Sequence, residues 1–268
     1  MGVFRPLPAV ASRREDVSFQ THPADALDAY TRPARRGGHH NRPNERRLIP
    51  WVNCDRFIEN VHRLLQTGYA SLSDKELNHF NRCDEPTITG GLAMRIQQLI
   101  DAGKVPGISR AWCVVDNWPE AALHLPLQKQ PKAKKRKLPD LKFRFGGQRQ
   151  ALYFRFEAKK LAGSGDYVDL ISHKDGLGRF LRRVYGRQDE AGGLLGYVQT
   201  ESPEIHAEHV RTALATNPKK YHVIPDGDWK AATWKDGPKC SFRAVHSRER
   251  ASVIVIFYSF LPFRPFAY

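Results

Sequence analysis

Two neighbouring stretches with strict alternation of apolar and polar side chains constrain the fold of this chain more than any other feature. They are LPDLKFRF, residues 138–145, and ALYFRFEAKKL, residues 151–161. Because successive side chains on a strand point to opposite faces, each stretch predicts a strand with one apolar and one polar face. The connection GGQRQ, residues 146–150, contains two glycines and suits a tight turn. We therefore expect an antiparallel hairpin.

The apolar faces predict the register of this hairpin. The register that sets apolar side chains opposite each other pairs Phe145 with Leu152, Phe143 with Phe154 and Leu141 with Phe156. It also brings Asp140 opposite Glu157, with Lys159 beside the glutamate on the polar face. Directly opposed residues have Cβ atoms about 4.5–5.5 Å apart, and like charges at that distance destabilise a sheet. A divalent cation between the two carboxylates would offset this cost.

Oxygen ligands such as these suit Mg²⁺ or Mn²⁺. Lys159 is then placed to orient or deprotonate an attacking water and to stabilise charge on a phosphate. The pattern predicts metal-assisted hydrolysis of a phosphodiester. The non-catalytic alternative is that these residues lie on the charged, solvent-facing side of an amphipathic hairpin, in which Glu157 and Lys159 form ordinary cross-strand pairs.

Pro139-Asp140, sixteen intervening residues and Glu157-Ala158-Lys159 form a motif that resembles the signature of the PD-(D/E)XK nuclease superfamily. A second Pro-Asp pair, at 225–226, is followed at once by Asp228-Trp229-Lys230 and leaves no room for a hairpin. The longer run EAKKL, DYV, GLGRFLRRVYG and GGLLGYV is similar to a group of bacterial members, many uncharacterised, found near restriction or phage-defence genes. The resemblance covers about residues 84–200.

The resemblance implies an α/β protein with a restriction-endonuclease-like αβββαβ core, whose mixed central sheet is flanked by helices. It implies Mg²⁺ or Mn²⁺ as the cofactor and DNA as the substrate. Asp140 and Glu157 would be metal ligands, Lys159 the catalytic lysine, and the backbone carbonyl of Ala158 a further ligand. Some members add an acid from the first helix, where Glu85 matches best. An acid in the first turn of a helix is also favoured by the helix dipole without any catalytic role.

The positive charge of the chain indicates a polyanionic partner. Lys and Arg outnumber Asp and Glu by 43 to 28, which gives a net charge of +15. Ribosomal and membrane-surface proteins share such a balance. The candidate contacts to nucleic acid lie in the helix-like run at 175–186 and the charge block at 128–137, and they are Arg179, Arg182, Arg183, Lys134, Lys135 and Arg136. A solvated helix face and a localisation signal are the respective alternatives. Gln199 is a candidate neighbour of the site or a plain solvent-facing strand residue.

Further elements follow from periodicity. Helices are expected at 54–66 and at about 86–102, the second with Asp84 as N-cap. A third helix is expected within DGLGRFLRRVYG, with Leu177, Phe180, Leu181 and Val184 at core spacing. The remaining expected strands are 110–117, 193–199, 241–247 and 251–260.

Four segments are expected along the chain. Residues 1–48 are rich in Arg, Pro, Gly and His and read as a basic, flexible arm. Residues 49–83 form a helical portion and residues 84–200 the nuclease core. Residues 201–268 form a C-terminal strand extension, which either completes the sheet or makes a small subdomain.

Cysteine and histidine spacing predicts no zinc or disulfide framework. Four cysteines are scattered without a CxxC pair, as expected of a reducing cytoplasm. His206 and His209 lie three apart in EIHAEHV and are able to bind a metal, but without a third ligand in the sequence a surface helix is favoured. For His39-His40 a solvated loop is favoured. No run approaches the roughly 18 apolar residues of a membrane span, so no membrane partner is expected and the location is predicted to be cytoplasmic.

Together these patterns predict a Mg²⁺-dependent (endo)deoxyribonuclease that acts in bacterial anti-phage defence or restriction. An ATPase or methyltransferase of a defence system and a second copy of the chain are further candidate partners. A non-catalytic nucleic-acid-binding protein on the same fold and an RNA-processing nuclease are the alternatives.

Overall fold

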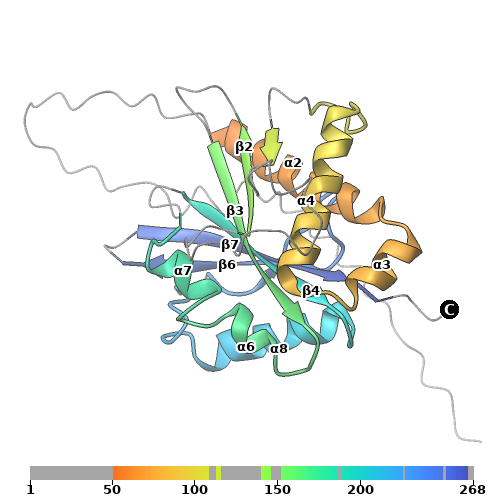
Figure 1. The fold of residues 1–268 in the computed structure, drawn as a ribbon. Coiled ribbons are helices and arrows are strands. Elements are labelled where there is room, and N and C mark those ends of the chain that lie inside the picture. The colour runs from red at the N-terminus through yellow and green to blue at the C-terminus, as the bar shows by residue number, and fades with distance from the viewer. Residues whose placement is uncertain are drawn as a thin grey trace, which may run out of the picture. The chain divides into compact units, whose positions relative to one another are not determined.

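A mixed β-sheet forms the centre of the fold (Figure 1). The computed structural model describes residues 51–108, 113–115, 140–145, 152–185, 189–225, 227–249 and 252–264. The strands are β1 (Cys113–Val115), β2 (Leu141–Phe145), β3 (Leu152–Leu161), β4 (Ala191–Val198), β5 (Lys230–Ala231), β6 (Ser241–Arg248) and β7 (Ser252–Pro262). Their order across the seven-stranded sheet is β1-β2-β3-β4-β7-β6-β5. β4 runs parallel to both β3 and β7, whereas the other neighbours are antiparallel.

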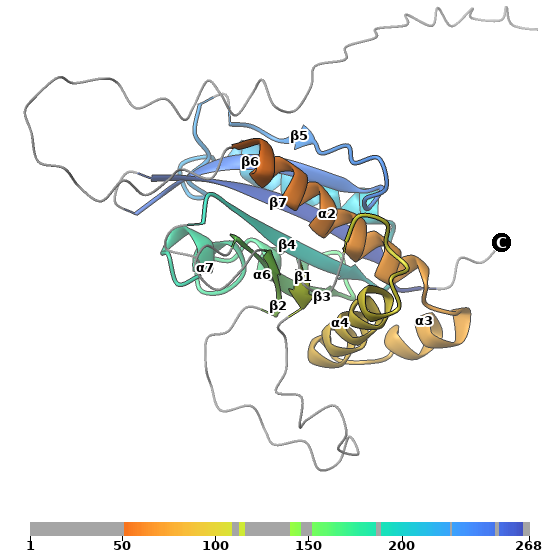
Figure 2. The same cartoon turned by 90° about the horizontal axis from the view of Figure 1, so that it is seen from above.

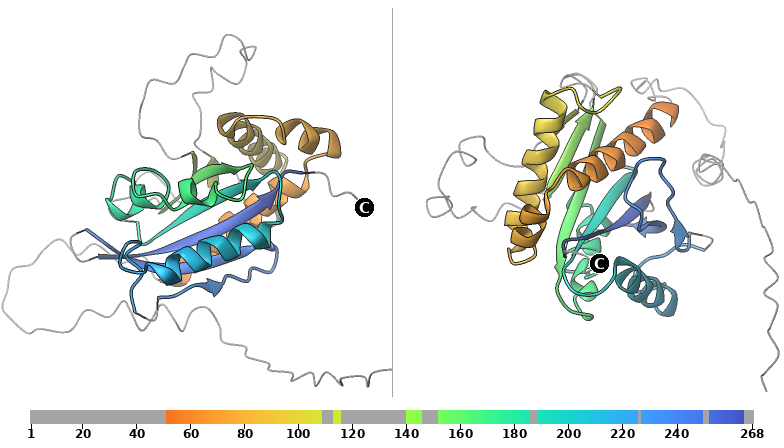
Figure 3. Two further views of the ribbon diagram at one scale, coloured as in Figure 1. Left: turned by 90° about the horizontal axis from the view of Figure 1, so that it is seen from below. Right: turned by 90° about the vertical axis from the view of Figure 1, so that its right-hand side faces the viewer.

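Helices cover both faces of this sheet (Figures 2 and 3). They are α2 (Trp51–Ala70), α3 (Asp74–Phe80), α4 (Glu85–Asp101), α6 (Tyr167–Leu170), α7 (Leu177–Leu181) and α8 (Pro203–Thr216). α2 and α4 lie on one side, whereas α6, α7 and α8 lie on the other, as the left view of Figure 3 shows. The protein is therefore an α/β protein with a mixed sheet between helices, as the sequence predicted.

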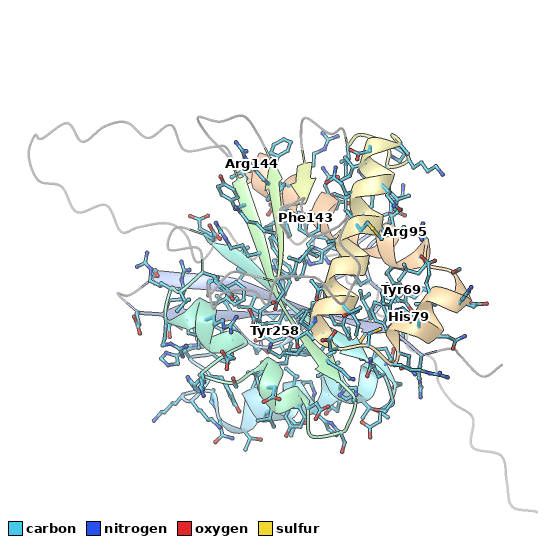
Figure 4. The ribbon with its side chains drawn as sticks, in the orientation of Figure 1. Tyr69, His79, Arg95, Phe143, Arg144 and Tyr258 are labelled. Atoms are coloured by element: carbon cyan, nitrogen blue, oxygen red, sulfur yellow. The ribbon has the colours of Figure 1, made fainter. Side chains whose placement is uncertain are left out.

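The register predicted for the hairpin is confirmed. Leu141 pairs with Phe156, Phe143 with Phe154 and Phe145 with Leu152. The alternation of faces is visible in Figure 4, where Phe143 and its neighbour Arg144 extend from opposite sides of β2. Phe143 is fully buried, whereas Arg144 is partly exposed. The strands expected at 193–199, 241–247 and 251–260 are also present, as β4, β6 and β7 respectively.

The apolar face of β3 packs against α2. Phe154 and Phe156 are almost fully buried and place their rings edge-on to the ring of His62 on α2. Full burial of a phenylalanine contributes roughly 1.5–3 kcal/mol to stability, so these two rings hold the strand firmly. The opposite face of the strand is thereby turned toward α6 and α7, and Leu161 at its end belongs to the core cluster on that side.

The two long N-terminal helices agree with their predictions in type. The expected helix at 54–66 extends further in both directions, as α2, and buries the expected apolar stripe of Phe57, Val61, Leu64 and Leu65. α4 begins where predicted, since the side chain of Asp84 accepts a hydrogen bond from the amide of Thr87 at 3.2 Å. Its first residue, Glu85, therefore has a fixed position at the start of the helix.

The helix expected within DGLGRFLRRVYG is shorter than predicted. α7 ends at Leu181, and Arg183 has a left-handed backbone with φ of 56°. Leu177, Phe180 and Leu181 are buried as expected, but Val184 is 37% exposed, so its assignment to the core was wrong. The left-handed residue breaks the helical phase between Leu181 and Val184.

Several predictions concern residues outside the described ranges. They are the basic arm at 1–48 with His39-His40, the charge block with Lys134, Lys135 and Arg136, Pro139 and the turn at 146–150. Residues Ile49–Tyr268 cluster into one compact unit, in which β6 and β7 continue the sheet beyond β4. No helix in the described ranges has the length and apolar composition that crossing a membrane requires.

Candidate active site

The candidate site lies where β2 begins and β3 continues past it. The last ladder pair is Leu141 with Phe156, and the amide of Asp140 still donates to the carbonyl of Phe156 at 3.1 Å. From residue 157 onward the β2 side of β3 therefore has no strand partner among the described residues. Exposed strand-edge amides must find other acceptors, and here two carboxylates supply them.

Asp140 and Glu85 accept hydrogen bonds from the open edge of β3. Asp140 Oδ2 accepts from the amide of Ala158 at 2.8 Å, and Glu85 Oε2 accepts from the amide of Lys160 at 3.2 Å. The amide and carbonyl of one strand residue point to the same side, so the carbonyl of Ala158 faces the same edge as Asp140. The three oxygen ligands predicted from sequence and Glu85 thus come from adjacent positions.

Lys159 lies between Glu85 and Glu157. Its Nζ lies 3.0 Å from Glu85 Oε1 and 3.3 Å from Glu157 Oε1. Glu157 is fully buried, and its Oε1 is close enough to Lys159 for an ion pair but has no hydrogen-bond geometry. An oxygen of this kind retains unused capacity to bind a cation.

The other oxygen of Glu157 is held by residues from the segment after β3. Arg179 Nη1 and the hydroxyl of Tyr185 each donate to Glu157 Oε2 at 2.9 Å, and Arg179 also donates to Tyr185. Asp175 in turn accepts from Arg179 Nη2 at 2.9 Å. We call Glu85, Asp140, Glu157, Lys159, Asp175 and Arg179 the sheet-edge cluster.

Two glycines bring Arg179 to Glu157. Gly176 has φ of 49°, and a Cβ there would lie 2.2 Å from the carbonyl oxygen of Leu170. A Cβ on Gly178 would lie 1.9 Å from the carbonyl oxygen of His173. The chain therefore folds back on itself so tightly before α7 that no side chain fits, and this turn aims Arg179 at β3.

A buried hydrogen bond connects the start of α4 to the sheet. The hydroxyls of Thr89 and Tyr197 lie 2.9 Å apart, and the Thr89 hydroxyl also donates to the carbonyl of Glu85. Tyr197 stands on β4, the neighbour of β3. The tyrosine thereby helps to fix the turn of α4 that places the Glu85 carboxylate at the edge of β3.

The electrostatics of the sheet-edge cluster are those of crowded carboxylates. Burial and the nearby charge of Glu157 raise the pKa of Asp140 to about 7, although the amide of Ala158 opposes the shift. Burial also raises the pKa of Glu85, against the attraction of Lys159. Burial alone would lower the pKa of Lys159, but Glu85, Glu157 and Asp140 outweigh it and raise the pKa. Lys159 is therefore an ammonium ion at neutral pH.

The charge balance of the cluster fits a divalent cation. The carboxylates of Glu85, Asp140, Glu157 and Asp175 face the two cations Lys159 and Arg179. When all are ionised, two negative charges remain uncompensated. Glu157 Oε1 has no hydrogen-bond partner, and the negative charge of Glu157 raises the pKa of Asp140. Both observations indicate that the cluster has too little positive charge. Asp140 and Glu157, with the Ala158 carbonyl, suit an oxygen-seeking ion such as Mg²⁺ or Mn²⁺.

Four predicted site residues lie elsewhere or act differently. Gln199 donates from Nε2 to the carbonyl of Phe80 at 3.2 Å and thus fastens the end of α3 rather than joining the cluster. Arg179, expected on a solvated, phosphate-facing surface, is turned inward onto Glu157 instead. Arg182 is exposed and donates to the carbonyl of Lys174, and Arg183 occupies the left-handed position that ends α7.

Two residues were not identified from the sequence as hydrogen-bond partners of Glu157. Tyr185 was not singled out, and Arg179 was assigned to phosphate. The signal for both was present, because the family-like progression includes an Arg-Phe pair and a following tyrosine, which here are Arg179-Phe180 and Tyr185. What the progression does not give is that these side chains fold back onto Glu157.

Comparison of the chain with protein-family models, with curated proteins and with solved structures gave no significant match.

Proposed function

We propose that the chain is a Mg²⁺-dependent deoxyribonuclease with a restriction-endonuclease-like core, acting in bacterial defence. The observation that carries this proposal is the convergence of Glu85, Asp140, Glu157 and Lys159 on the open edge of β3. A solvent-facing hairpin would leave such residues in exposed pairs, whereas here Glu157 is fully buried and Asp140 has a strongly raised pKa. Perturbed titratable groups of this kind cluster at active sites.

The order of elements supports the same proposal. The described chain runs α4, β1, β2, β3, α6 with α7, and β4, with β4 parallel to β3. This is the αβββαβ order that the motif led us to expect. The net charge of +15 supports a nucleic-acid substrate, since phosphates are the polyanion that such a balance attracts.

In the proposed hydrolysis of a phosphodiester, Asp140, Glu157 and the carbonyl of Ala158 would hold the divalent ion. When bound, the ion would supply Lewis acidity at the scissile phosphate. Lys159 is protonated, so its ammonium group orients the attacking water and stabilises negative charge on the phosphate. Arg179 and Tyr185 hold Glu157 in position.

The test is cleavage of closed-circular plasmid DNA by the purified full chain with Mg²⁺ or Mn²⁺. Glu157→Gln and Lys159→Met should each lower the cleavage rate by ~10³-fold, because the first removes a charged ligand of the divalent ion and the second removes the cation that stabilises the phosphate. Lys142→Met on β2 is the matched control. Lys142 lies with its Nζ over the ring of Tyr153, 4.8 Å from the centroid, and is not part of the cluster. It should retain the wild-type rate.

The rival functions give different results in the same assay. A binding protein without catalysis retards the plasmid on a gel but leaves it closed at every metal concentration. An RNA-processing enzyme cleaves an RNA substrate offered beside the DNA and spares the plasmid. Cleavage that persists in both Glu157→Gln and Lys159→Met would refute the assignment of this site.

A further inference from the structure

A second group of polar side chains lies around the start of α8. Glu201 precedes the helix, whose N-cap is Ser202, and His206 and His209 lie on its first turns. One ligand atom from each of the three lies within 4.8 Å of the other two. Within the described residues no other set of three or more such side chains does so. We call these residues the α8 cluster.

Positions i and i+3 share one face of a helix, so His206 and His209 project to the same side of α8. That side faces inward. His206 is fully buried, and His209 packs with its ring centroid 5.3 Å from that of Tyr167 on α6. Glu201 reaches the same place from the β4–α8 connection, with its Oε2 3.8 Å from His206 Nε2. Three segments of the chain therefore meet there.

Four buried side-chain atoms of the α8 cluster have no hydrogen bond among the described residues. Both ring nitrogens of His206, Nδ1 of His209 and Oε2 of Glu201 are buried without a hydrogen-bond partner. A buried polar atom left without a partner costs about 1–3 kcal/mol, so four together need an explanation. A bound ion that accepts lone pairs from nitrogen and oxygen would supply one.

The other fully buried histidines show that this is specific to His206. His246 is satisfied at both nitrogens, by the carbonyl of Tyr221 at 2.8 Å and by the hydroxyl of Tyr258 at 2.9 Å. His62 donates from Nδ1 to Ile58 at 2.9 Å and stacks on Trp234. Only His206, of these three, has neither nitrogen bonded. A structural core histidine is therefore found in this fold with partners, and His206 departs from that pattern.

We propose that Glu201, His206 and His209 form a binding site for a divalent transition metal of the Zn²⁺ type. Two imidazoles and one carboxylate are a ligand set that Zn²⁺ takes, whereas Mg²⁺ prefers oxygen alone. A tetrahedral Zn²⁺ holds its ligand atoms about 3.4 Å apart, given bonds of about 2.0–2.1 Å. The three ligand atoms lie within 4.8 Å of one another, so the cluster reaches this spacing by a contraction of at most about 1.4 Å, and the side chain of Glu201 is partly exposed and free to move.

Three protein ligands leave the fourth position of the ion to water. The site is distinct from the sheet-edge cluster, since it uses different residues, a different helix and different ligand chemistry. Its consequence is mechanical, because the ion would fasten the β4–α8 connection to the first two turns of α8.

The test uses the purified full chain, stripped with EDTA, dialysed against ZnCl₂ and analysed for bound zinc. Wild type should retain about one equivalent, and Zn²⁺ at about a hundredfold its Kd should raise Tm by ~5 °C. Glu201→Gln and His209→Gln, at partly exposed positions, should each weaken zinc binding by at least ~10-fold. Circular dichroism checks that these variants fold.

Two controls separate this site from others on the chain. Glu208→Gln removes a carboxylate from the exposed face of the same helix, where it pairs with Arg211, and should keep the zinc equivalent. Asp140→Asn, in the sheet-edge cluster, should keep it as well. The proposal is overturned if wild type retains no zinc, or if folded Glu201→Gln and His209→Gln retain it with unchanged affinity.

Discussion

The sheet-edge cluster and the α8 cluster both contain polar side chains that are buried in the folded core. They differ in whether these buried polar atoms have partners within the protein. In the first, carboxylates face two cations, and Glu157 alone contacts Lys159, Arg179 and Tyr185. In the second, Glu201, His206 and His209 make no hydrogen bond to one another. The first is held together by charge pairing with an excess of negative charge, whereas among the described residues the second has no ion pair with a Lys or Arg side chain.

The two clusters therefore differ in what stabilises them in the folded protein. Charge pairs satisfy one another when the chain folds, so removing one partner of a buried pair in the sheet-edge cluster is costly. A neutral imidazole has no such attraction to a carboxylate, and burial lowers the pKa of His206 and thereby favours its uncharged form. The α8 cluster should therefore be insensitive to substitution until a metal is present.

The largest effect is expected from Arg179→Met. It leaves the fully buried Glu157 with Lys159 as its remaining cation, and breaking a buried pair on one side costs about 3 kcal/mol. Urea unfolding in EDTA measures the change. Tyr185→Phe, which deletes one hydrogen bond to the same oxygen, should cost about 1–2 kcal/mol. Arg182→Met, at an exposed position in the turn after α7, is the control and should change stability by less than about 0.5 kcal/mol.

An intermediate effect is expected from Asp140→Asn, and it should depend on pH. The pKa of Asp140 is raised from 3.8 to about 7 in the fold. Between these values the folded protein keeps a proton that the unfolded chain has released, so wild type loses stability as pH rises from about 4 to 7. The asparagine variant lacks this loss. In EDTA it should be more stable than wild type by about 1–2 kcal/mol at pH 8, with the difference vanishing near pH 4.

Added Mg²⁺ provides a further comparison between wild type and Asp140→Asn. It should raise the stability of wild type at pH 8 and have little effect on Asp140→Asn, since the variant lacks the anionic ligand. Equal stability of the two proteins at pH 8 without metal would show that the carboxylates do not repel one another, and the contrast between the clusters would fail.

The smallest effect is expected from Glu201→Gln in EDTA. The carboxylate lies 3.8 Å from a neutral imidazole and is about one-third exposed, so the change should stay within about 0.5 kcal/mol. Thermal unfolding of wild type and variant side by side measures it. A loss of 2 kcal/mol or more would mean that His206 is protonated and paired with Glu201, and that the α8 cluster is a salt bridge like those of the first cluster.

Much of the fold was predictable because it depends on local periodicity. The alternation in residues 138–145 and 151–161 gave the register of β2 and β3 correctly, and Asp84 marked the start of α4. The length of α7 was not predictable, because its end depends on the left-handed backbone of Arg183. Periodic side chains alone, such as Val184, do not reveal that break.

The candidate site was predictable only in part. The hairpin register places Asp140, Glu157 and Lys159 together, and no long-range information is needed for that. Glu85 was a lesser candidate, and the structure brings its carboxylate to Lys159 from a helix more than seventy residues earlier in the chain. Arg179 was expected to face solvent, because the helical pattern cannot show which residues face a strand that the chain returns to.

The sequence alone predicted β2, β3, β4, β6 and β7, the hairpin register and the position of two acids and a lysine on one face, since a period of two residues encodes faces directly. The tertiary structure decided which distant side chains complete each cluster. It turned Arg179 and Tyr185 onto Glu157, and it brought Glu201 to the two histidines of α8 as the third ligand that the spacing of the histidines alone did not provide. The physical reason is that loops and crossovers, which periodicity does not describe, determine where separate elements meet.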